Sequence, residues 1–308
     1  MICDSILDAM GSTPLVRLNR MANADSAQIL VKFEALNVGG SVKTRTAYSM
    51  ILDAERRGII HPDSIIVEPT SGNQGVGLAL VAAVRGYKAV IIMPDSVSPE
   101  RRELVELYGA EVITVHDSGN IGDCIDECLR TALRMQEDDP KVWVPQQFTN
   151  PANPEVHRLT TAREIISQAG IRIDGFCSGI GTGGTLSGIG EALRAENPDT
   201  LIWAVEPSSA AILSGGHIGS HLQMGIGDGL IPGNLNTRIF DSTFIVTDED
   251  AIDAAKRLAR LEGLACGITG GSNMVAALAM AKQLGPGKTV VTLLPDTAER
   301  YYSTPLFS

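Results

Sequence analysis

The chain has 308 residues, of which 44% are hydrophobic and 20% are charged. This length allows two domains with sizeable cores, and the composition is typical of a compact protein. The formal charge of −11 excludes the basic surface that nucleic-acid binding requires. No run approaches the roughly 18 apolar residues of a membrane span, and no signal peptide is visible. We therefore expect a cytoplasmic protein with neither a nucleic-acid nor a membrane partner.

The first unusual segment is EALNVGGSVKTRTAYSMIL, residues 34–52, with a single lysine at its centre. Lys43 follows Gly39-Gly40-Ser41 at the expected start of a helix. The positive end of a helix and apolar neighbours such as Val42 favour the neutral amine over the ammonium ion. Lys43 is thus either an exposed charge in an unfavourable place or a group that reacts as an amine.

Short apolar runs then alternate with helical patterns. We expect strands at 64–68, 88–94, 111–115 and 142–145, then at 175–180, 201–207, 242–247 and 289–295. Ser98 is expected to cap the helix that Pro99 opens. The alternation predicts an α/β fold with two open, twisted, mostly parallel sheets that carry helices on both faces. We place a smaller N-terminal domain at 38–150 and a larger domain at 1–37 plus 151–308.

Small polar loops follow several of these strands: EPTSGNQG, GIGTGGTLSG and LPDTAERYYS. In open α/β sheets, ligands bind where strands end and helices begin. The loop 181–188, GTGGTLSG, suits one phosphate group, since glycines let backbone N–H groups approach an anion. A structural turn and a dinucleotide site remain alternatives, whereas the absent Gly-Lys-Ser/Thr ending argues against a nucleotide triphosphatase.

One phosphate site together with one reactive lysine indicates pyridoxal phosphate. The lysine condenses with the aldehyde of this cofactor, and the glycine loop anchors its phosphate.

The remaining charged and sulfur-containing residues suggest no further chemistry. Arg56-Arg57 and Arg101-Arg102 lie beside glutamates, as is typical of solvated helix faces. The cysteines Cys3, Cys124, Cys128, Cys177 and Cys266 include no C-x-x-C pair. We expect buried free thiols and no metal site.

Six ordered motifs, NVGGSVKTR, EPTSGNQG, PQQFTNPANPEVH, GIGTGGTLSG, GIGDGLIP and LPDTAERYYSTPLF, resemble those of the cysteine synthase and cystathionine β-synthase family. The resemblance runs from about residue 8 to the C-terminus. It implies the fold-type II architecture of pyridoxal-phosphate enzymes, with the active site in the cleft between two domains, and a homodimer.

The resemblance also implies roles for individual residues. Lys43 corresponds to the Schiff-base lysine, which also moves the substrate α-proton. The other cofactor contacts are the ring 3-hydroxyl partner Asn73, the phosphate loop Gly181, Thr182, Gly183, Gly184 and Thr185, and Thr269 at the pyridine nitrogen. The substrate α-carboxylate is assigned to Thr70, Ser71, Gly72 and Gln147.

Thr269 favours a particular class of reaction. A hydroxyl partner, unlike a carboxylate, does not hold a proton on the ring nitrogen, so the ring withdraws electrons less strongly. This disfavours transamination and leaves loss of a β-substituent, through an α-aminoacrylate intermediate, as the easy path. We expect β-replacement or β-elimination on cysteine or an O-activated serine, as in cysteine synthases.

The sequence departs from the family pattern at Thr44, where aspartate is common, at Gln74, where threonine is common, and at Asp228, where a small residue is common. Asp228 has three possible roles. As a general base it could take a proton from water, and the enzyme would then convert cysteine to serine and hydrogen sulfide. It could instead orient a larger thiol or amine acceptor, as in cystathionine β-synthases, or it could cap a turn. A non-catalytic relative and a dinucleotide-dependent oxidoreductase are the competing functional classes.

Overall fold

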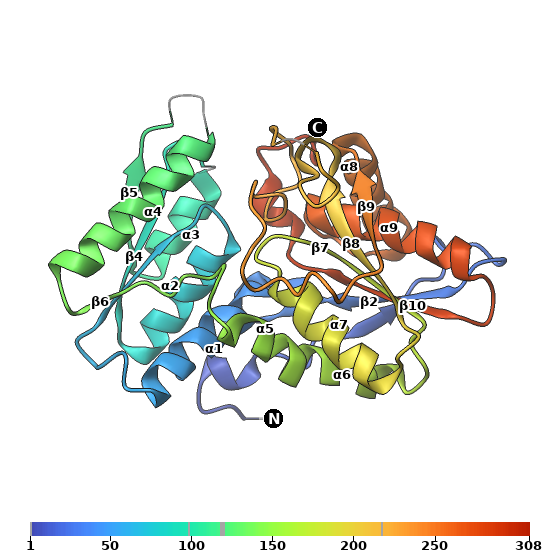
Figure 1. The fold of residues 1–308 in the computed structure, drawn as a ribbon, viewed down its shortest axis with the longest axis horizontal. Coiled ribbons are helices and arrows are strands. Elements are labelled where there is room, and N and C mark those ends of the chain that lie inside the picture. Colours follow the sequence, from blue (N-terminus) through green and yellow to red (C-terminus); the bar gives the residue numbers. More distant parts are fainter. Residues whose placement is uncertain (1, 98, 118–120, 217) are drawn as a thin grey trace. The chain divides into compact units, whose positions relative to one another are not determined.

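The computed structural model describes residues 2–97, 99–117, 121–216 and 218–308 (Figure 1). The chain divides into two compact units: unit 1 comprises Met1–Met10 and Lys43–Asn153, and unit 2 comprises Gly11–Val42 and Pro154–Ser308. The domain assignment made from the sequence stays a prediction. Ser98, the expected helix cap, lies outside the described residues.

Unit 1 is built on a parallel sheet with the strand order β5-β4-β3-β6. Its strands are β3 (Ile65–Pro69), β4 (Lys88–Pro94), β5 (Glu111–Val115) and β6 (Val142–Trp143). Its helices are η1 (Ile6–Ala9), α1 (Lys43–Arg56), α2 (Asn73–Arg85), α3 (Pro99–Leu107) and α4 (Ile121–Asp138), and α5 (Ala152–Val156) begins at its end.

Helices cover both faces of the sheet in unit 1 because its inner strands, such as β4, direct apolar side chains to both faces. Val90 and Ile92 of β4 face α4 and pack with its buried Cys128. Ile91, between them, faces α2 and contacts the position where Gly75 would carry a Cβ atom. Helix α2 ends at Gly86, whose φ of 81° is the left-handed conformation that glycine adopts without strain.

Unit 2 has the strand order β1-β2-β10-β7-β8-β9, in which β1 is antiparallel to β2 and the other pairs are parallel. Its strands are β1 (Leu15–Arg17), β2 (Gln28–Phe33), β7 (Gly175–Gly179), β8 (Leu201–Pro207), β9 (Ser242–Val246) and β10 (Thr289–Leu294). Its helices are η2 (Glu34–Leu36), η3 (Val38–Gly40), the π-helix η4 (His157–Thr161), α6 (Ala162–Ala169), α7 (Gly184–Glu196), η5 (Ser208–Ala210), α8 (Asp248–Arg257), the π-helix η6 (Leu258–Glu262), α9 (Ile268–Leu284) and η7 (Ala298–Tyr301).

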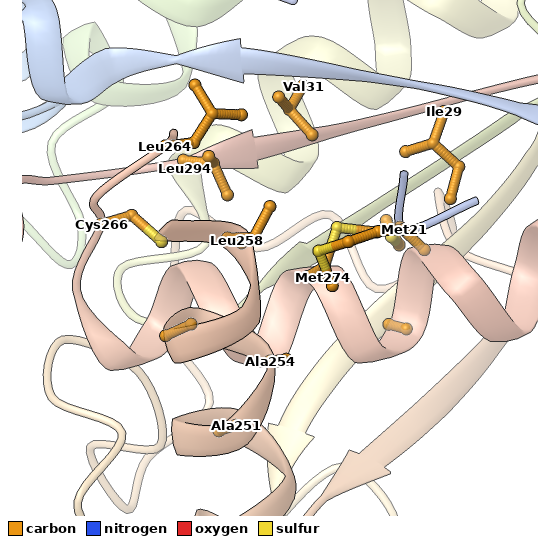
Figure 2. Packing of buried hydrophobic residues seen from close by; sticks show 14 of the residues in the cluster. Met21, Ile29, Val31, Ala251, Ala254, Leu258, Leu264, Cys266, Met274 and Leu294 are labelled. Atoms are coloured by element: carbon orange, nitrogen blue, oxygen red, sulfur yellow. The ribbon is translucent and has the colours of Figure 1, made fainter. Parts of the chain in front are cut away.

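The main core of unit 2 lies between its sheet and helices α8 and α9. Figure 2 shows Ala251 of α8 and Met274 of α9 below Ile29 and Val31 of β2. The two helices approach closely, since a Cβ atom at Gly271 would overlap the backbone oxygen of Ala251. Each fully buried side chain of the size of Ile29 stabilises the fold by about 1.5–3 kcal/mol.

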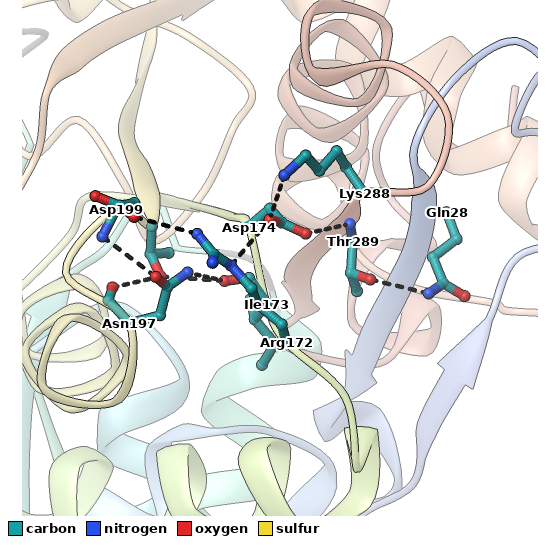
Figure 3. Close-up of polar contacts among 9 residues, drawn as sticks. Gln28, Arg172, Ile173, Asp174, Asn197, Asp199, Lys288 and Thr289 are labelled. Carbon is teal, nitrogen blue, oxygen red and sulfur yellow. Dashed lines mark hydrogen bonds and ion pairs between the residues drawn. The ribbon is translucent and has the colours of Figure 1, made fainter.

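Ionic and polar contacts brace the amino ends of the unit 2 strands (Figure 3). Asp174, just before β7, accepts a hydrogen bond from the backbone of Thr289 at 3.0 Å and pairs with Lys288 at 3.1 Å. Arg172 bridges Asp174 and Asp199, with both N–O distances at 3.3 Å. The glycine-rich loops lie at the opposite, carboxyl ends of the strands.

Candidate active site

Helix α1 begins at Lys43, and the side chain of this lysine is half-buried. The Lys43 carbonyl oxygen accepts a hydrogen bond from the Thr46 hydroxyl at 2.8 Å. Helix α2 passes close by, since a Cβ atom at Gly77 would lie 3.0 Å from the same oxygen. The backbone that carries Lys43 is therefore held by its own helix and by α2.

The loop Thr70–Gly72 joins β3 to α2 and is half-buried. Thr70 anchors it: its N–H donates to the Ile92 carbonyl at 2.9 Å, and its hydroxyl accepts from the Gly72 N–H at 3.2 Å. Asn73 is the first residue of α2, whose leading N–H groups have no acceptor within the helix. The start of α2 thus presents the backbone donors and the positive dipole end that suit an anion such as a carboxylate.

Gln147 is held by the same strand that leads into this loop. The Glu68 carboxylate, in β3, accepts hydrogen bonds from the backbone N–H groups of Gln146 and Gln147, both at 2.9 Å. Glu68 is 1% exposed, and burial raises the pKa of its carboxyl to about 7. Gln147 is itself 5% exposed, so its position depends on this buried contact.

In unit 2, residues 180–183 connect β7 to α7 in a shape that only glycine permits at two positions. A Cβ atom at Gly181 would overlap the carbonyl oxygen of Gly225. Gly183 has a φ of 78°, and a Cβ atom there would lie 2.8–2.9 Å from Leu235. Glycine at both positions lets the loop pack this closely and lead directly into α7, whose leading backbone N–H groups suit a phosphate.

Thr185 completes the predicted phosphate loop and contacts His157 of the π-helix η4. The Thr185 hydroxyl lies 3.3 Å from Nε2 of His157, and Nδ1 of the same ring lies 3.0 Å from the Thr161 hydroxyl. His157 is 1% exposed. This buried histidine therefore connects the predicted phosphate loop to η4.

Asp228 lies beside the same loop. Its Oδ2 atom is 3.5 Å from the position of a Cβ atom on Gly181. The aspartate is exposed and stands between Gly227 and Gly229, both with positive φ, 70° and 78°. The Gly227 N–H donates to the Ile180 carbonyl at 3.0 Å, which ties this turn to the end of β7.

Thr269, at the start of α9, is connected to the segment that carries Asp228. Its hydroxyl donates to the Met224 carbonyl at 2.8 Å, and the residue is 4% exposed. The segment 224–229 therefore contacts Gly181 of the phosphate loop on one side and Thr269 on the other. Unit 2 thus brings together the predicted phosphate, ring-nitrogen and Asp228 positions, and unit 1 brings together Lys43, the Thr70–Asn73 loop and Gln147.

Comparisons with known proteins decide the family. A sequence model described as pyridoxal-phosphate dependent enzyme matches residues 6–296. The chain is 48% identical to a cysteine synthase of Staphylococcus aureus over 306 residues, which cover 99% of this chain and 97% of the relative. The chain belongs to the pyridoxal-phosphate-dependent enzyme family.

Solved structures agree with this assignment. An O-ureido-L-serine synthase is 42% identical, with a TM-score of 0.93, and the match covers 100% of this chain and 96% of that one. A hydrogen sulfide-producing enzyme of Fusobacterium nucleatum is 39% identical, with a TM-score of 0.91, and the match covers 97% of this chain and all of that one. The protein is a pyridoxal-phosphate-dependent enzyme of the cysteine synthase type, with small amino acids as substrates.

Pyridoxal phosphate fits the residues present. The loop Gly181–Thr185 leads into the start of α7, whose leading backbone N–H groups and positive dipole end suit one phosphate. Lys43 supplies an amine at a helix start, and Thr269 supplies a hydroxyl. The individual site residues remain predictions.

Two neighbours of the site were missed in the sequence. Arg101 is 7% exposed, and its guanidinium donates to the Ser71 carbonyl at 3.4 Å, so the expectation of a solvated face is wrong for this residue. Glu68 was not singled out either. No local signal marks Arg101, whereas the acidic residue inside an otherwise apolar strand could have identified Glu68 as a buried, hydrogen-bonded group.

The cysteines take no part in the site. Four of the five are buried free thiols as expected, and Cys3 is exposed, so the expectation of burial is wrong for it. Burial raises the pKa of Cys128 and of Cys177 to about 12, which makes their thiolates rare at neutral pH. Among the described residues, no group of three or more His, Cys, Asp or Glu could hold a metal ion, and no helix could span a membrane.

Proposed function

We propose that this enzyme replaces the β-substituent of an O-activated L-serine, with sulfide as the nucleophile and cysteine as the product. The observation that carries the proposal is the glycine loop Gly181–Thr185, which leads into the start of α7 in unit 2 and is suited to one phosphate. Lys43, at the start of α1 in unit 1, is the amine proposed to hold the cofactor. Similarity to a cysteine synthase over 99% of the chain supports it.

Each group has a distinct task in this proposal. When bound, pyridoxal phosphate supplies an aldehyde for amines and a ring that withdraws electrons from the substrate α-carbon. Lys43 holds the cofactor before substrate arrives and then moves the α-proton. Thr70, Ser71, Gly72 and Gln147 bind the α-carboxylate, Asn73 and Thr269 bind the ring, and Gly181–Thr185 bind the phosphate.

Lys43→Ala tests the attachment of the cofactor. The purified enzyme should be yellow, and the variant should lose the absorption that depends on the lysine because Lys43 is the amine proposed to condense with the cofactor aldehyde. Lys282→Ala, an exposed lysine near the end of α9, is the matched control and should keep the absorption. A colourless enzyme that does not respond to added pyridoxal phosphate would contradict the proposal.

A second candidate reaction is the conversion of cysteine and water to serine and hydrogen sulfide. It is favoured by Asp228, whose carboxylate lies 3.5 Å from the Cβ position of Gly181 and can take a proton from water. The 39% identical relative described as hydrogen sulfide-producing supports it. A larger thiol or amine acceptor that Asp228 orients is the remaining alternative.

Asp228→Asn distinguishes these reactions. If Asp228 is the base, the variant should release sulfide from cysteine at least tenfold more slowly, with serine formation falling in parallel, because general-base catalysis contributes about 10²–10⁴-fold. Synthesis of cysteine from O-acetyl-L-serine should be less affected, since hydrosulfide needs no base. Asp253→Asn, in α8, is the control. An unchanged rate and product ratio in Asp228→Asn would remove the aspartate from the mechanism.

We further propose a cytoplasmic homodimer. The family resemblance supports the dimer, and the free cysteines support a reducing compartment. Light scattering coupled to size-exclusion chromatography tests the dimer: a mass near twice 32.6 kDa is expected.

A further inference from the structure

The buried carboxylate of Glu68 connects two segments that the proposed function assigns to one substrate group. Glu68 stands at the carboxyl end of β3, two residues before Thr70. Each of its oxygens accepts one backbone hydrogen bond at 2.9 Å, Oε2 from Gln146 and Oε1 from Gln147. β3 therefore leads directly into the Thr70–Gly72 loop and also binds the Gln147 segment through its carboxylate.

The segment that Glu68 binds has a conformation that needs support. Gln146 has a φ of 56°, in the left-handed region, which is uncommon for a residue other than glycine and costs about 1–2 kcal/mol. The side chain of Gln146 is exposed and contributes little packing to offset that cost. The turn is closed by its carbonyl, which accepts from the N–H groups of Thr149 and Asn150 at 3.0 Å. Glu68 binds the other side of the same turn.

Both backbone polar groups of Gln147 are consequently occupied. Its N–H donates to Glu68, and its carbonyl accepts from the Asn153 side chain at 2.8 Å. The N–H and the carbonyl of Gln147 are both hydrogen-bonded, and the residue is 5% exposed. The backbone position from which its side-chain carboxamide extends is therefore fixed. A carboxamide can donate hydrogen bonds to a substrate carboxylate, provided that it is oriented before the substrate arrives.

A carboxylate near a carboxylate site would ordinarily weaken binding by repulsion. Glu68 is 1% exposed and both of its oxygens accept backbone donors, so it presents no free oxygen to a substrate. Burial also raises the pKa of its carboxyl to about 7, so a fraction of the molecules carry no charge there near neutral pH.

We propose that Glu68 is a positioning residue for amino-acid binding: it holds Gln147 and the Thr70–Gly72 loop in the arrangement that receives the substrate α-carboxylate. The inference rests on the proposed function. Glu68 does not touch the substrate and acts only through the turn at Gln146 and Gln147.

The test compares the holoenzyme with its Glu68→Gln variant. Glutamine keeps one acceptor oxygen but places an NH₂ group against a backbone N–H, so one of the two hydrogen bonds is lost. Binding of L-alanine, which has no β-leaving group, is measured through the change in cofactor absorption. We expect the dissociation constant and the KM for O-acetyl-L-serine to rise roughly tenfold or more. The KM for sulfide and the retention of cofactor should be unchanged.

Two further variants separate positioning from general stability. Asp174→Asn also removes a buried carboxylate that accepts a hydrogen bond from a backbone N–H, but this carboxylate lies at the amino ends of the unit 2 strands. The variant should lower the thermal unfolding midpoint without changing L-alanine binding. Gln146→Gly, added to Glu68→Gln, should restore part of the lost affinity, because glycine adopts a φ of 56° without strain.

In Glu68→Asp the side chain is shorter by one methylene group, and the loss of L-alanine affinity should be milder. This variant replaces Glu68→Gln in the test if the glutamine variant does not fold. The inference is overturned if Glu68→Gln or Glu68→Asp loses thermal stability yet binds L-alanine like the wild type. If the wild-type enzyme holds no cofactor or binds no amino acid, the proposed function itself is wrong, and this inference with it.

Discussion

Gly181 and Gly183 must both be glycine, for different physical reasons. At Gly181 a side chain has no room, because its Cβ atom would overlap the carbonyl oxygen of Gly225. At Gly183 the backbone itself is left-handed, with a φ of 78°, and Leu235 also lies close. At the scale of single residues, the shape of the predicted phosphate loop thus requires that both positions lack a side chain. It also depends on the turn 225–229, which packs against the loop.

Gly181→Ala should therefore reduce pyridoxal phosphate affinity by at least tenfold, since the loop or the Gly225 turn must shift to admit the methyl group. Equilibrium dialysis against the cofactor measures this. Gly170→Ala is the control: its φ of 60° makes alanine cost about 1 kcal/mol of stability, but nothing lies within 4 Å of the new atom. Equal cofactor affinity in both variants would show that the loop tolerates a side chain.

At the scale of elements, a glutamate before proline at a strand end occurs in both units. Glu68-Pro69 ends β3, and Glu206-Pro207 ends β8. Glu206 is 3% exposed and accepts the backbone N–H groups of Leu213 at 2.7 Å and of Ser214 at 3.2 Å. In each case a buried carboxylate accepts hydrogen bonds from two consecutive backbone N–H groups of a loop. These donors are 78 and 79 residues from Glu68 but only 7 and 8 residues from Glu206.

Glu68 should also give the protein a specific pH dependence. Its folded pKa of about 7 lies above the ordinary value of 4.5, so the folded state binds more protons between these values and stability falls as pH rises through them. The loss, complete above pH 7, amounts to about 3 kcal/mol. Glu68→Gln cannot titrate at this position, so its free energy of urea unfolding should rise relative to that of the wild type as pH rises from 4.5 to 7. A stability difference that does not vary with pH would contradict the raised pKa.

At the scale of the whole molecule, each unit has its own hydrophobic clusters. The cluster around α4 belongs to unit 1, and the clusters around α9 and around α7 belong to unit 2. The two tryptophans of the chain are divided between the units: Trp143 is in β6, and Trp203 is in β8, stacked on Phe244 at a centroid distance of 5.3 Å. Tryptophan fluorescence can therefore report on each unit separately.

Inorganic phosphate should stabilise unit 2 selectively, because the proposed phosphate site, Gly181–Thr185, lies entirely within it. In Lys43→Ala with Trp143→Phe, the Trp203 signal should shift to higher denaturant with phosphate, by about 2.7 kcal/mol at a concentration one hundred times the dissociation constant. In Lys43→Ala with Trp203→Phe, the Trp143 signal should shift less. Equal shifts would mean that the units unfold as one cooperative body.

Much of the fold could be predicted from the sequence because inner strands such as β4, β8 and β10 are buried on both faces and are therefore almost continuously apolar. The runs 88–94, 111–115 and 201–207 coincide with β4, β5 and β8. Strands β1 and β2 were not predicted. Lys32 interrupts the apolar run of β2, and only the structure shows that this lysine is fully buried and paired with Glu164 at 2.7 Å.

The sequence by itself determined the α/β class, the cofactor and the start of α1 at Lys43, because glycines, helix starts and apolar runs act over a few neighbouring residues. The tertiary structure alone decided what surrounds those groups: Asp228 beside Gly181, His157 against Thr185, and Glu68 bonded to Gln146 and Gln147. His157 and Thr185 are 28 positions apart in the sequence, and Glu68 and Gln147 are 79 positions apart. Asp228 and Gly181 are 47 positions apart. They depend on how parallel strands place distant loops at one edge of a sheet, and no local pattern records that placement.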